Sequence, residues 1–389
     1  MTATGPDRAA QAIRVLEEAY GPAIPTAVAQ AKDLLGASGA VLYLVDYRLS
    51  RLYPLAAPGQ EPGQAVTVEG TPEGRVFASQ QVILSAAAGE VIGRAAVSIH
   101  GERLGVLELR YPDPAPPQLE SWLAVLSVAA ARSLRVSLRS TDLFERTVRS
   151  QRLSLAAEMQ WQLLPGRGCR ADDFELAGQL EPAYHVAGDN FDWSVDPAEL
   201  WVSISDGAGS GVAAAQVAAL AMTAVRNARR GGLGLADQAR MADEALFGLH
   251  RGEAPVQALL VRLDRVTGAV SAVGTGAARL LIQRGMQVWT AELEDQLPLG
   301  ALEGTVYREQ PVPVRPGDRL VMVSDGLHGA QPAGRSAFGE ARLEQALRSL
   351  QLVPPAETLR QLIAELISHH DGDDLHDDAV AVVIDWHPH

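Results

Sequence analysis

The chain has 389 residues, 47% of them hydrophobic, and 33 Lys and Arg stand against 47 Asp and Glu, giving a formal net charge of −14 at pH 7. This hydrophobic content is typical of a folded globular protein and argues against a disordered chain. The length is too great for one ordinary core, so we expect two domains. The acidic excess argues against nucleic acid as a partner, because no basic stripe is present to neutralise phosphates.

We find no membrane-spanning segment and no secretory signal in the sequence. No run of about eighteen apolar residues occurs. Residues 1–8 have neither a basic start followed by an apolar core nor a small-residue cleavage site. We therefore expect a cytoplasmic protein without a membrane partner. The single cysteine, Cys169, cannot form an internal disulfide and leaves no multi-thiolate metal site.

The N-terminal third of the chain is predicted to form an α+β domain. Residues 10–36 have the apolar spacing of an amphipathic helix, or of two helices separated near Pro22 and Pro25. The further expected elements are a buried strand at 39–46, a short helix at 72–78, and a hairpin formed by residues 91–99 and 104–109.

Two segments of this region, residues 74–78 and 101–107, carry its clearest resemblance to a known domain family. On them, residues 10–137 resemble a GAF domain, a module that senses small molecules and signals. The resemblance implies a GAF-like α/β sensor domain, either with a small-molecule ligand or used for dimerisation without one. No Cys or His is placed to hold haem or a bilin covalently.

Residues 118–165 are predicted to form a helical, coiled-coil-like signalling linker. Apolar residues recur there with the alternating spacing of 3 and 4 that a coiled coil requires. We expect a homodimer through this helix, and the alternative is a plain helix packed on its own domain. The spaced positions are Leu119, Leu123, Leu126 and Ala130, then Phe144, Val148, Gln151, Leu155 and Met159.

Four aspartates between residues 189 and 377 have small-residue neighbours: Asp189, Asp206, Asp325 and Asp377. Three of the four settings follow a β-branched or apolar run and open into glycine or a turn. This context places a carboxylate at the end of a strand, facing a cleft. Converging carboxylates repel one another unless a hard divalent cation neutralises them. The pattern therefore indicates a binuclear metal centre and hydrolysis of a phosphate ester.

An ordered series of short motifs surrounds these aspartates, at residues 156–165, 181–183, 186–192, 205–215, 297–300, 317–320, 324–327 and 377–378. Through this series, residues 156–386 resemble the SpoIIE/RsbU-type bacterial phosphatases of the PPM (PP2C-like) superfamily. Each motif is weak alone, because Asp-Gly by itself is usually a turn, and the order of the series carries the resemblance. It implies a PP2C-like β-sandwich flanked by helices over residues 166–387.

The resemblance also implies roles for the aspartates. Asp206 would bridge two divalent cations, Mn²⁺ or Mg²⁺, and the backbone carbonyl of Gly207 would be a further ligand. Asp325 and Asp377 would hold the second ion, and Asp189 would bind the first directly or through its waters. Two ions about 3.5–4 Å apart can activate water and neutralise the phosphoryl charge together. The four aspartates are therefore the predicted catalytic residues.

Each aspartate also has a structural alternative. Asp206 could cap a helix that begins just after it, Asp325 could begin a turn, and Asp377 with Asp378 could form a solvated loop. Their joint occurrence in family order favours the metal site. For Asp192 and Asp378 we expect roles in solvent or behind the metal ligands rather than direct ligation.

Three positions and the glycine-rich turn at residues 206–211 depart from the family pattern. Ala277 stands where a turn usually ends in histidine, Gln257 replaces an expected threonine, and Val380 lies where threonine is common. None of these departures removes a predicted ligand. They bear on turnover and substrate positioning, and they leave open a catalytically degenerate module that binds a phosphorylated partner without efficient turnover.

The function implied by the resemblance is metal-dependent dephosphorylation of serine or threonine on a regulatory protein. By family analogy this substrate is a phosphorylated anti-sigma-factor antagonist of STAS type, and the GAF-like domain and linker would control the activity. A shift of the linker would move the helix after Asp206 and change metal occupancy. A rival function is hydrolysis of a small phosphate ester. Nucleotide hydrolysis is disfavoured, because no glycine-rich loop is followed by Lys and Ser or Thr.

Overall fold

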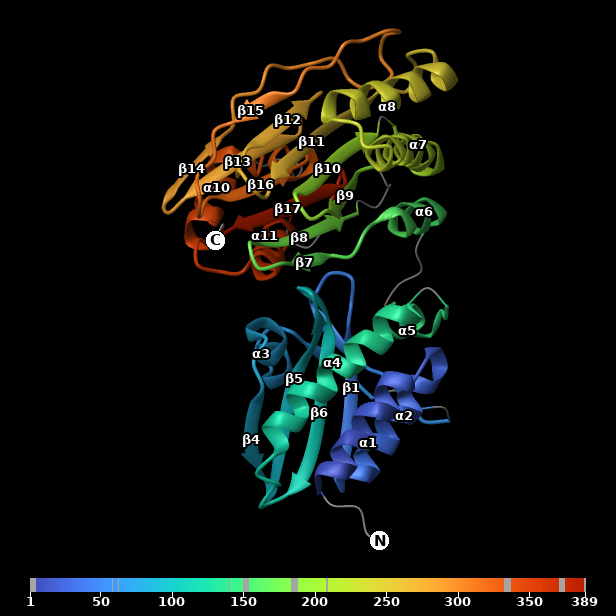
Figure 1. Cartoon of the computed structure of the whole chain (residues 1–389), viewed down its shortest axis with the longest axis vertical. Coiled ribbons are helices and arrows are strands. Elements are labelled where there is room, and N and C mark those ends of the chain that lie inside the picture. Colours follow the sequence, from blue (N-terminus) through green and yellow to red (C-terminus); the bar gives the residue numbers. More distant parts are fainter. Residues whose placement is uncertain are drawn as a thin grey trace. The chain divides into compact units, whose positions relative to one another are not determined.

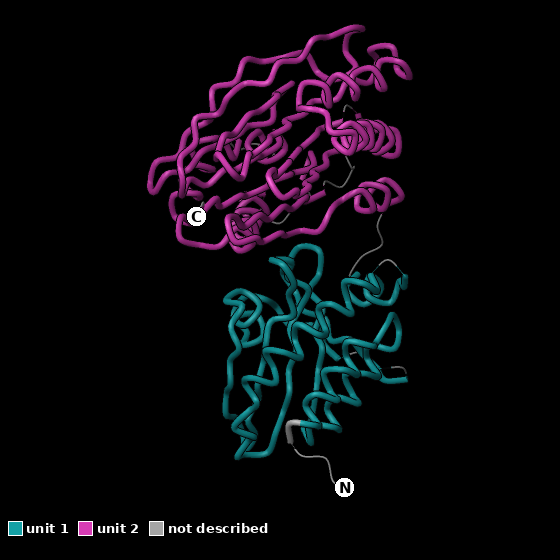
Figure 2. The backbone as a smooth tube through the Cα atoms, viewed as in Figure 1, with its two compact units in different colours: residues 1–152 teal, residues 153–389 magenta. Residues whose placement is uncertain are grey.

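The computed structural model describes residues 5–57, 59–61, 63–138, 140–149, 154–182, 188–207, 209–331, 337–370 and 375–387. The chain divides into two compact units, Met1–Arg152 (unit 1) and Leu153–His389 (unit 2), as Figures 1 and 2 show. The boundary falls inside the segment predicted as a linker, so the first part of that segment belongs to unit 1 and its last helix to unit 2.

Unit 1 contains one antiparallel sheet covered by helices on both faces. Its elements are α1 (Gly5–Glu18), η1 (Gly21–Ala23), α2 (Ile24–Leu35), β1 (Gly39–Val45), β2 (Arg51–Pro54), β3 (Val66–Thr67), α3 (Pro72–Ser79), β4 (Ile83–Ala87), β5 (Glu90–Ile99), β6 (Glu102–Pro112), α4 (Leu119–Ser137) and α5 (Leu143–Val148). The sheet has six strands in the order β3-β2-β1-β6-β5-β4. Side chains alternate between its faces, so one face packs on α1, α2 and α4 and the other on α3.

The elements predicted for this region are confirmed. The strand at 39–46, the helix at 72–78 and the hairpin at 91–109 correspond to β1, α3 and the β5–β6 pair. Residues 10–36 form two α-helices with the short helix η1 between them. Pro22 and Pro25 lie at the first positions of η1 and α2, where a missing backbone N–H costs nothing. Gly36, with φ of 70°, ends α2 in the left-handed conformation that glycine adopts readily.

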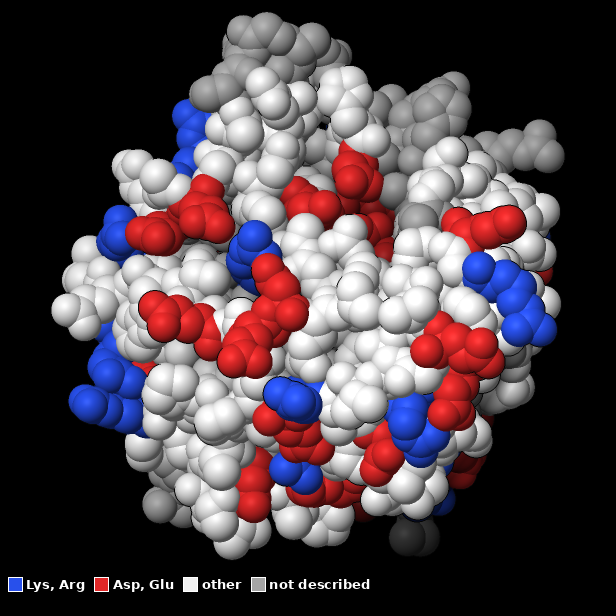
Figure 3. All heavy atoms as spheres, turned by 90° about the horizontal axis from the view of Figure 1, so that it is seen from above, with Lys and Arg blue, Asp and Glu red and all other residues white. Residues whose placement is uncertain are grey.

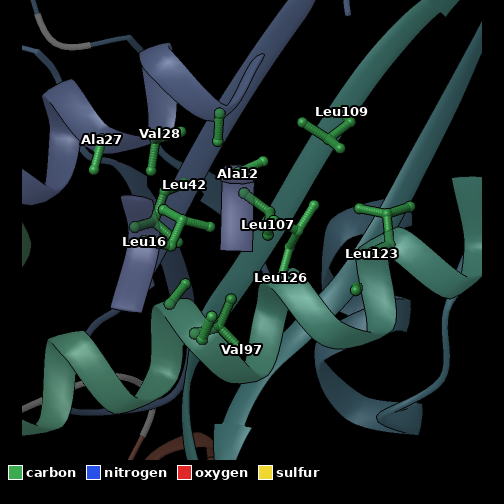
Figure 4. Packing of buried hydrophobic residues seen from close by; sticks show 14 of the residues in the cluster. Ala12, Leu16, Ala27, Val28, Leu42, Val97, Leu107, Leu109, Leu123 and Leu126 are labelled. Carbon is green, nitrogen blue, oxygen red and sulfur yellow. The ribbon is translucent and has the colours of Figure 1, made fainter. Parts of the chain in front are cut away.

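The predicted coiled-coil seam is wrong along α4, because its residues lie inside the core of unit 1. Leu119, Leu123, Leu126 and Ala130 are at most 1% exposed. In Figure 4, Leu123 and Leu126 point from α4 toward the sheet and the side chain of Leu107. A helix that buries one face in its own domain has nearly the same apolar spacing as a coiled coil. The alternative, a helix packed on its own domain, is therefore confirmed here, and this seam offers no surface to a second copy.

The rest of the predicted linker is not one continuous helix either. Helix α4 ends at Ser137, α5 is a separate short helix with Phe144 buried in unit 1, and the next helix begins at Leu155. Gln151 lies outside the described residues. Of the predicted seam beyond α4, Leu155 is exposed at 66%. The sequence contains no proline across this stretch, and the helix breaks without one.

Truncation of Leu123 should destabilise unit 1 strongly. Its Cδ1 lies so close to β5 that a Cβ added at Gly93 would be 2.5 Å away. We expect Leu123→Ala to lower the free energy of unfolding by about 2–5 kcal/mol, measured by urea denaturation. The matched control is Val125→Ala on the exposed side of the same helix, 49% exposed, with an expected change within about 0.5 kcal/mol. Equal effects of the two substitutions would contradict this packing.

Unit 2 is a sandwich of two antiparallel sheets between two pairs of helices. Its elements are α6 (Leu155–Leu163), β7 (Gly168–Arg170), β8 (Phe174–Glu181), β9 (Asn190–Val195), β10 (Glu199–Gly207), α7 (Gly211–Arg230), α8 (Leu235–His250), β11 (Val256–Asp264), β12 (Val270–Gly274), β13 (Arg279–Arg284), β14 (Gln287–Thr290), β15 (Gln310–Val312), β16 (Arg319–Val323), α9 (Asp325–His328), α10 (Gly339–Ser349), α11 (Pro355–His369) and β17 (Ala379–Trp386).

The five-stranded sheet of unit 2 has the order β15-β12-β11-β10-β9, and its six-stranded sheet has the order β14-β13-β16-β17-β8-β7. Apolar side chains of both sheets meet in a common core. Helices α7 and α8 cover the outer face of the five-stranded sheet, and α10 and α11 cover that of the six-stranded sheet (Figure 1). The predicted β-sandwich flanked by helices is confirmed.

The molecular surface carries both signs of charge. On the face in Figure 3, Lys and Arg side chains are dispersed among Asp and Glu rather than joined into a basic area. None of the helices described is long and apolar enough to span a bilayer.

Candidate metal centre

Asp189 and Asp206 lie at the same end of two neighbouring strands in the five-stranded sheet. Asp206 is the second-last residue of β10, and Asp189 directly precedes β9. The two strands are antiparallel, with Ser205 opposite Asn190, so the end of one lies beside the start of the other. The alternative of Asp206 as a helix cap is wrong, because α7 begins at Gly211 with Ser210 as its N-cap.

The six-stranded sheet places Asp325 and Asp377 in the same way. Asp325 follows β16 and is the first residue of α9, while Asp377 precedes β17 by two residues. Ser324 joins the strands: its N–H donates to the Val380 carbonyl at 3.0 Å, and its hydroxyl accepts from the Val380 N–H at 3.0 Å. Each sheet thus contributes two carboxylates from adjoining strand ends.

The carboxylates of the two sheets are close enough to raise one another's pKa. Burial, then the charges of Asp325 and Asp377, raise the pKa of Asp206 to about 6. Burial, then the charge of Asp206, raise the pKa of Asp189 well above its usual value. Burial, then the charge of Asp325, raise the pKa of Asp377. The four predicted residues therefore lie near enough to interact through their charges, and we call them the carboxylate cluster. Asp189, Asp206 and Asp377 have a raised pKa, and carboxyls perturbed in this way occur at functional sites.

Asp189 is the most isolated member of this cluster. It is 1% exposed, and among the described residues no group donates a hydrogen bond of standard geometry to either carboxylate oxygen, although the nearby Ser324 hydroxyl favours its charged form. In the part of the chain that the structure describes, no Lys or Arg forms an ion pair with Asp189, Asp206 or Asp377. A buried carboxylate without such a partner is costly unless a proton or a cation compensates it.

The donor set fits a hard divalent cation, because carboxylate and carbonyl oxygens are the ligands that Mg²⁺ and Mn²⁺ prefer. Across the described ranges, however, no group of three or more His, Cys, Asp or Glu side chains is arranged as a ready metal site. The ligand roles of Asp189, Asp206, Gly207, Asp325 and Asp377 therefore stay predictions. A Cβ at Gly207 would lie 3.4 Å from the carbonyl oxygens of Ala214 and Gly188. Packing alone does not require glycine there, which leaves close approach of a ligand as the reason proposed.

Of the two roles expected for Asp192 and Asp378, in solvent or behind the predicted ligands, the structure excludes the first, because both side chains are buried. Asp378 is fully buried, and its Oδ2 accepts hydrogen bonds from Gln160 Nε2 at 2.7 Å and from the Gly188 N–H at 3.1 Å. Asp192 is 2% exposed and forms ion pairs with Arg226 at 2.9 Å and Arg229 at 3.0 Å, both on α7. Asp378 thus lies behind the cluster, where it holds the backbone just before Asp189.

Gln160 on α6 is a residue that the sequence reading missed. Its Nε2 donates to the carbonyl of Asp189 as well as to Asp378, so one amide connects segments from both sheets. The signal was available: Gln160 shares the buried face of α6 with Ala156 and Ala157. A polar side chain at 1% exposure on an apolar helix face needs a partner.

The two departures at Gln257 and Ala277 are in direct contact. Gln257 is opposite Asp206 in the pairing of β10 with β11, and its Oε1 accepts a hydrogen bond from the Ala277 N–H at 2.5 Å. Val380 is buried in the core between the sheets. The departures therefore lie beside the carboxylate cluster or behind it, and not among the predicted ligands.

Unit 2 thus belongs to the class of two-sheet α+β sandwiches that carry clustered carboxylates at one end of both sheets. Residues 196–387 match the family model described as stage II sporulation protein E (SpoIIE). Over these residues of its C-terminal part, the chain is similar to the SpoIIE family. A comparison with curated protein sequences gave no match.

Several solved structures are similar to the chain. The PP2C domain of SiaA from Pseudomonas aeruginosa has 22% identity, covers 54% of this chain and 85% of its own, and has a TM-score of 0.49. The PP2C phosphatase domain of SpoIIE from Bacillus subtilis with a fragment of its regulatory domain has 14% identity, 82% and 88% coverage, and a TM-score of 0.48. The RsbU and RsbW domains of a Mycobacterium tuberculosis protein have 20% identity, 56% and 60% coverage, and a TM-score of 0.48.

Proposed function

We propose that unit 2 is a metal-dependent protein phosphatase acting on phosphoserine or phosphothreonine. The observation that carries this proposal is the cluster of four aspartates at adjoining strand ends of both sheets, in which Asp189 is buried and forms no ion pair with a Lys or Arg among the residues that the structure describes. Carboxylates placed like this repel one another, and a protein retains such an arrangement where cations are bound.

In this proposal two Mn²⁺ or Mg²⁺ ions are held by the aspartate cluster. Asp206 would be a ligand of both ions and the Gly207 carbonyl a further ligand. Asp189 would hold the first ion, directly or through its waters, and Asp325 and Asp377 would hold the second. When bound, the cations supply a hydroxide nucleophile near neutral pH and neutralise the phosphoryl charge. The chain's own contribution is to hold these carboxylates in place: the Ser324–Val380 pair fixes the strand ends that bear Asp325 and Asp377.

The substrate we propose is a phosphorylated regulatory protein of STAS type, an anti-sigma-factor antagonist. This step rests on the resemblance of residues 156–386 to SpoIIE/RsbU-type phosphatases and on the match of residues 196–387 to the SpoIIE family. Unit 1, in the same proposal, is a GAF-like sensor. Its helix-covered antiparallel sheet is compatible with that assignment.

The first test is Mn²⁺-dependent phosphate release by the full chain from a phosphorylated STAS-type protein, compared with release from a small ester such as p-nitrophenyl phosphate. Release that requires Mn²⁺ and is faster with the phosphoprotein supports the proposal. Preference for the small ester would instead identify a small-ester hydrolase. Tight binding of the phosphoprotein without turnover would identify the degenerate binding module, the second candidate, which the departures from the family pattern at Gln257 and Ala277 motivate.

We further propose that α6, the first helix of unit 2, regulates the site. Gln160 contacts the segments of Asp189 and Asp378, and Ala156 and Ala157 pack with Ala215 near the start of α7. At its other end, the Leu163 carbonyl accepts a hydrogen bond from Arg226 of α7. A displacement of α6 would therefore move α7 and the backbone on both sides of the cluster, as a bistable element does.

Removal of the Gln160 amide should weaken metal binding. Groups that orient metal ligands typically contribute about 10–100-fold in affinity, and we expect a loss in this range for Mn²⁺ in Gln160→Leu, measured by isothermal titration calorimetry. Gln162→Leu on the exposed side of α6 is the matched control and should bind Mn²⁺ as the unmodified chain does. Unchanged Mn²⁺ affinity in Gln160→Leu would exclude α6 as a regulator through this contact.

A further inference from the structure

The crossover at residues 275–278 joins the two sheets of unit 2 at the end that carries the carboxylates. It leaves β12 at Gly274 in the five-stranded sheet and enters β13 at Arg279 in the six-stranded sheet. On the first side, β12 pairs with β11, whose second residue is opposite Asp206. On the other side, Arg279 pairs with Val323, two residues before Asp325. The crossover is thus a covalent connection between the two pairs of aspartates.

Both polar groups of the Ala277 backbone are held by side chains from opposite sides of this crossover. The N–H of Ala277 donates to Gln257 Oε1 at 2.5 Å, and its carbonyl accepts from His328 Nε2 at 3.0 Å. A carbonyl can only accept, so Nε2 of His328 carries the proton in this contact. His328 is the last residue of α9, which begins at Asp325. Through one residue, the strand beside Asp206 is connected to the helix of Asp325.

The neighbouring crossover residues, Thr275 and Gly276, support this contact. A Cβ on Gly276 would lie 2.1 Å from Gln257 Oε1, so no residue other than glycine fits beneath the amide. Thr275 is fully buried; its hydroxyl accepts from the Ala258 N–H at 2.9 Å, and its own N–H donates to the Ala258 carbonyl at 2.8 Å. The crossover is therefore fastened to the five-stranded sheet, and His328 connects it to the helix on the other side.

We propose that Gln257, Ala277 and His328 form a clamp that sets the separation between Asp206 and Asp325, so that Gln257 and His328 are positioning residues for the metal centre. This inference rests on the metal-dependent function proposed above. Like charges on the two sheets push the strand ends apart, whereas two cations that share ligands need a separation of about 3.5–4 Å. A hydrogen-bonded connection across the end of the sandwich opposes this repulsion and helps to keep the aspartates at the separation that two cations need.

The first measurement is Mn²⁺ affinity by calorimetry on the full chain. Gln257→Leu removes the amide at similar size, and we expect Mn²⁺ affinity to fall about three- to tenfold, which corresponds to the loss of one hydrogen bond. His328→Leu should have the same effect, whereas His328→Gln keeps an N–H donor and should restore most of the affinity. Because both side chains act on one peptide group, the double variant should lose little more than either single variant.

Gln283→Leu is the matched control. Gln283 is a buried strand glutamine whose Nε2 donates to the Leu347 carbonyl at 2.8 Å, and it lies toward the other end of β13. Its loss removes a comparable hydrogen bond and should lower thermal stability while Mn²⁺ affinity stays unchanged. Unmodified affinity in Gln257→Leu, or equal weakening in Gln283→Leu, would overturn the clamp as a positioning device.

A second readout separates this inference from the function on which it rests. In EDTA, Gln257→Leu and His328→Leu should speed amide hydrogen exchange in the peptides that contain Asp206 and Asp325, and Gln283→Leu should not. If the unmodified chain binds no Mn²⁺, the proposed function fails, and exchange still decides whether the clamp holds the two strand ends together. Unchanged exchange in both clamp variants would refute the clamp itself.

Discussion

Asp206→Asn is expected to lower the rate of phosphate release at saturating Mn²⁺ by at least about 100-fold. Removing a group that only orients a metal ligand costs about 10–100-fold, and loss of a bridging carboxylate should cost more. After burial, the charges of Asp325 and Asp377 on the other sheet are the largest causes that raise the pKa of Asp206. Asparagine keeps the shape of the side chain but removes the charge that would balance two cations. The measurement is Mn²⁺-dependent release of phosphate from a phosphorylated STAS-type protein.

The control for this result is Asp264→Asn. Asp264 lies at the opposite end of the same pair of strands, opposite Glu199, and accepts hydrogen bonds from the Val266 and Thr267 N–H groups in an exposed turn. Its replacement removes one aspartate charge from β11 without touching the cluster, so turnover should stay at the level of the unmodified chain. If Asp206→Asn kept that level too, the bridging role would be wrong.

The apolar spacing of residues 119–130 shows what sequence periodicity can and cannot predict. It correctly indicates a helix with one buried face, because a 3–4 spacing places those side chains on one side. It does not say what covers that face. Leu119, Leu123 and Leu126 satisfy a coiled-coil seam equally well, and the structure shows that they pack on their own sheet. The partner of an amphipathic helix is decided by tertiary contacts, which a local pattern does not contain.

The candidate site, too, could be predicted from the sequence only in part. The strand-end settings of Asp189, Asp206, Asp325 and Asp377 could be read from the sequence, because a β-branched run that opens into glycine or a turn marks where a strand stops. Their convergence depends on the pairing of β9 with β10 and of β16 with β17. No spacing along the chain predicts that pairing. The convergence of the four aspartates could therefore be expected only from the order of the motifs, which resembles that of a known family.

The contacts made by the residues that support the cluster could not be predicted from the sequence. Gln160 lies 29 positions before Asp189 and 218 before Asp378, and a glutamine has no motif of its own. In the sequence, Gln257 and Ala277 are two separate departures from a family pattern. Only the structure shows that their hydrogen bond joins them. Side-chain contacts between residues far apart in the sequence depend on the fold, so they can be recognised only once the fold is known.

We expect the titration of the clustered aspartates to lower the free energy of unfolding of metal-free unit 2 as the pH rises from about 4 to about 7. The pKa of Asp206 in the folded chain is about 6, against about 3.9 for an unfolded aspartate. The pKa values of Asp189 and Asp377 are raised too. A carboxyl with a raised pKa binds its proton more tightly when folded, so between these values the free energy of unfolding decreases with pH. For Asp206 the loss is roughly 2–3 kcal/mol, at about 1.4 kcal/mol per pH unit.

Asp206→Asn isolates the contribution of Asp206, because asparagine does not titrate. In EDTA at pH 8 the variant should unfold at a higher temperature than the unmodified chain, by about 4–12 °C in the transition of unit 2 at roughly 2–4 °C per kcal/mol. The two melting temperatures should converge near pH 4. Mn²⁺ should stabilise the unmodified chain at pH 8, much less at pH 5 where protons compete, and the variant least of all. Parallel pH profiles of the two proteins in EDTA would contradict the raised pKa. A carboxylate that destabilises its own fold at neutral pH, and is stabilised there by a cation, is one retained for binding that cation rather than for folding.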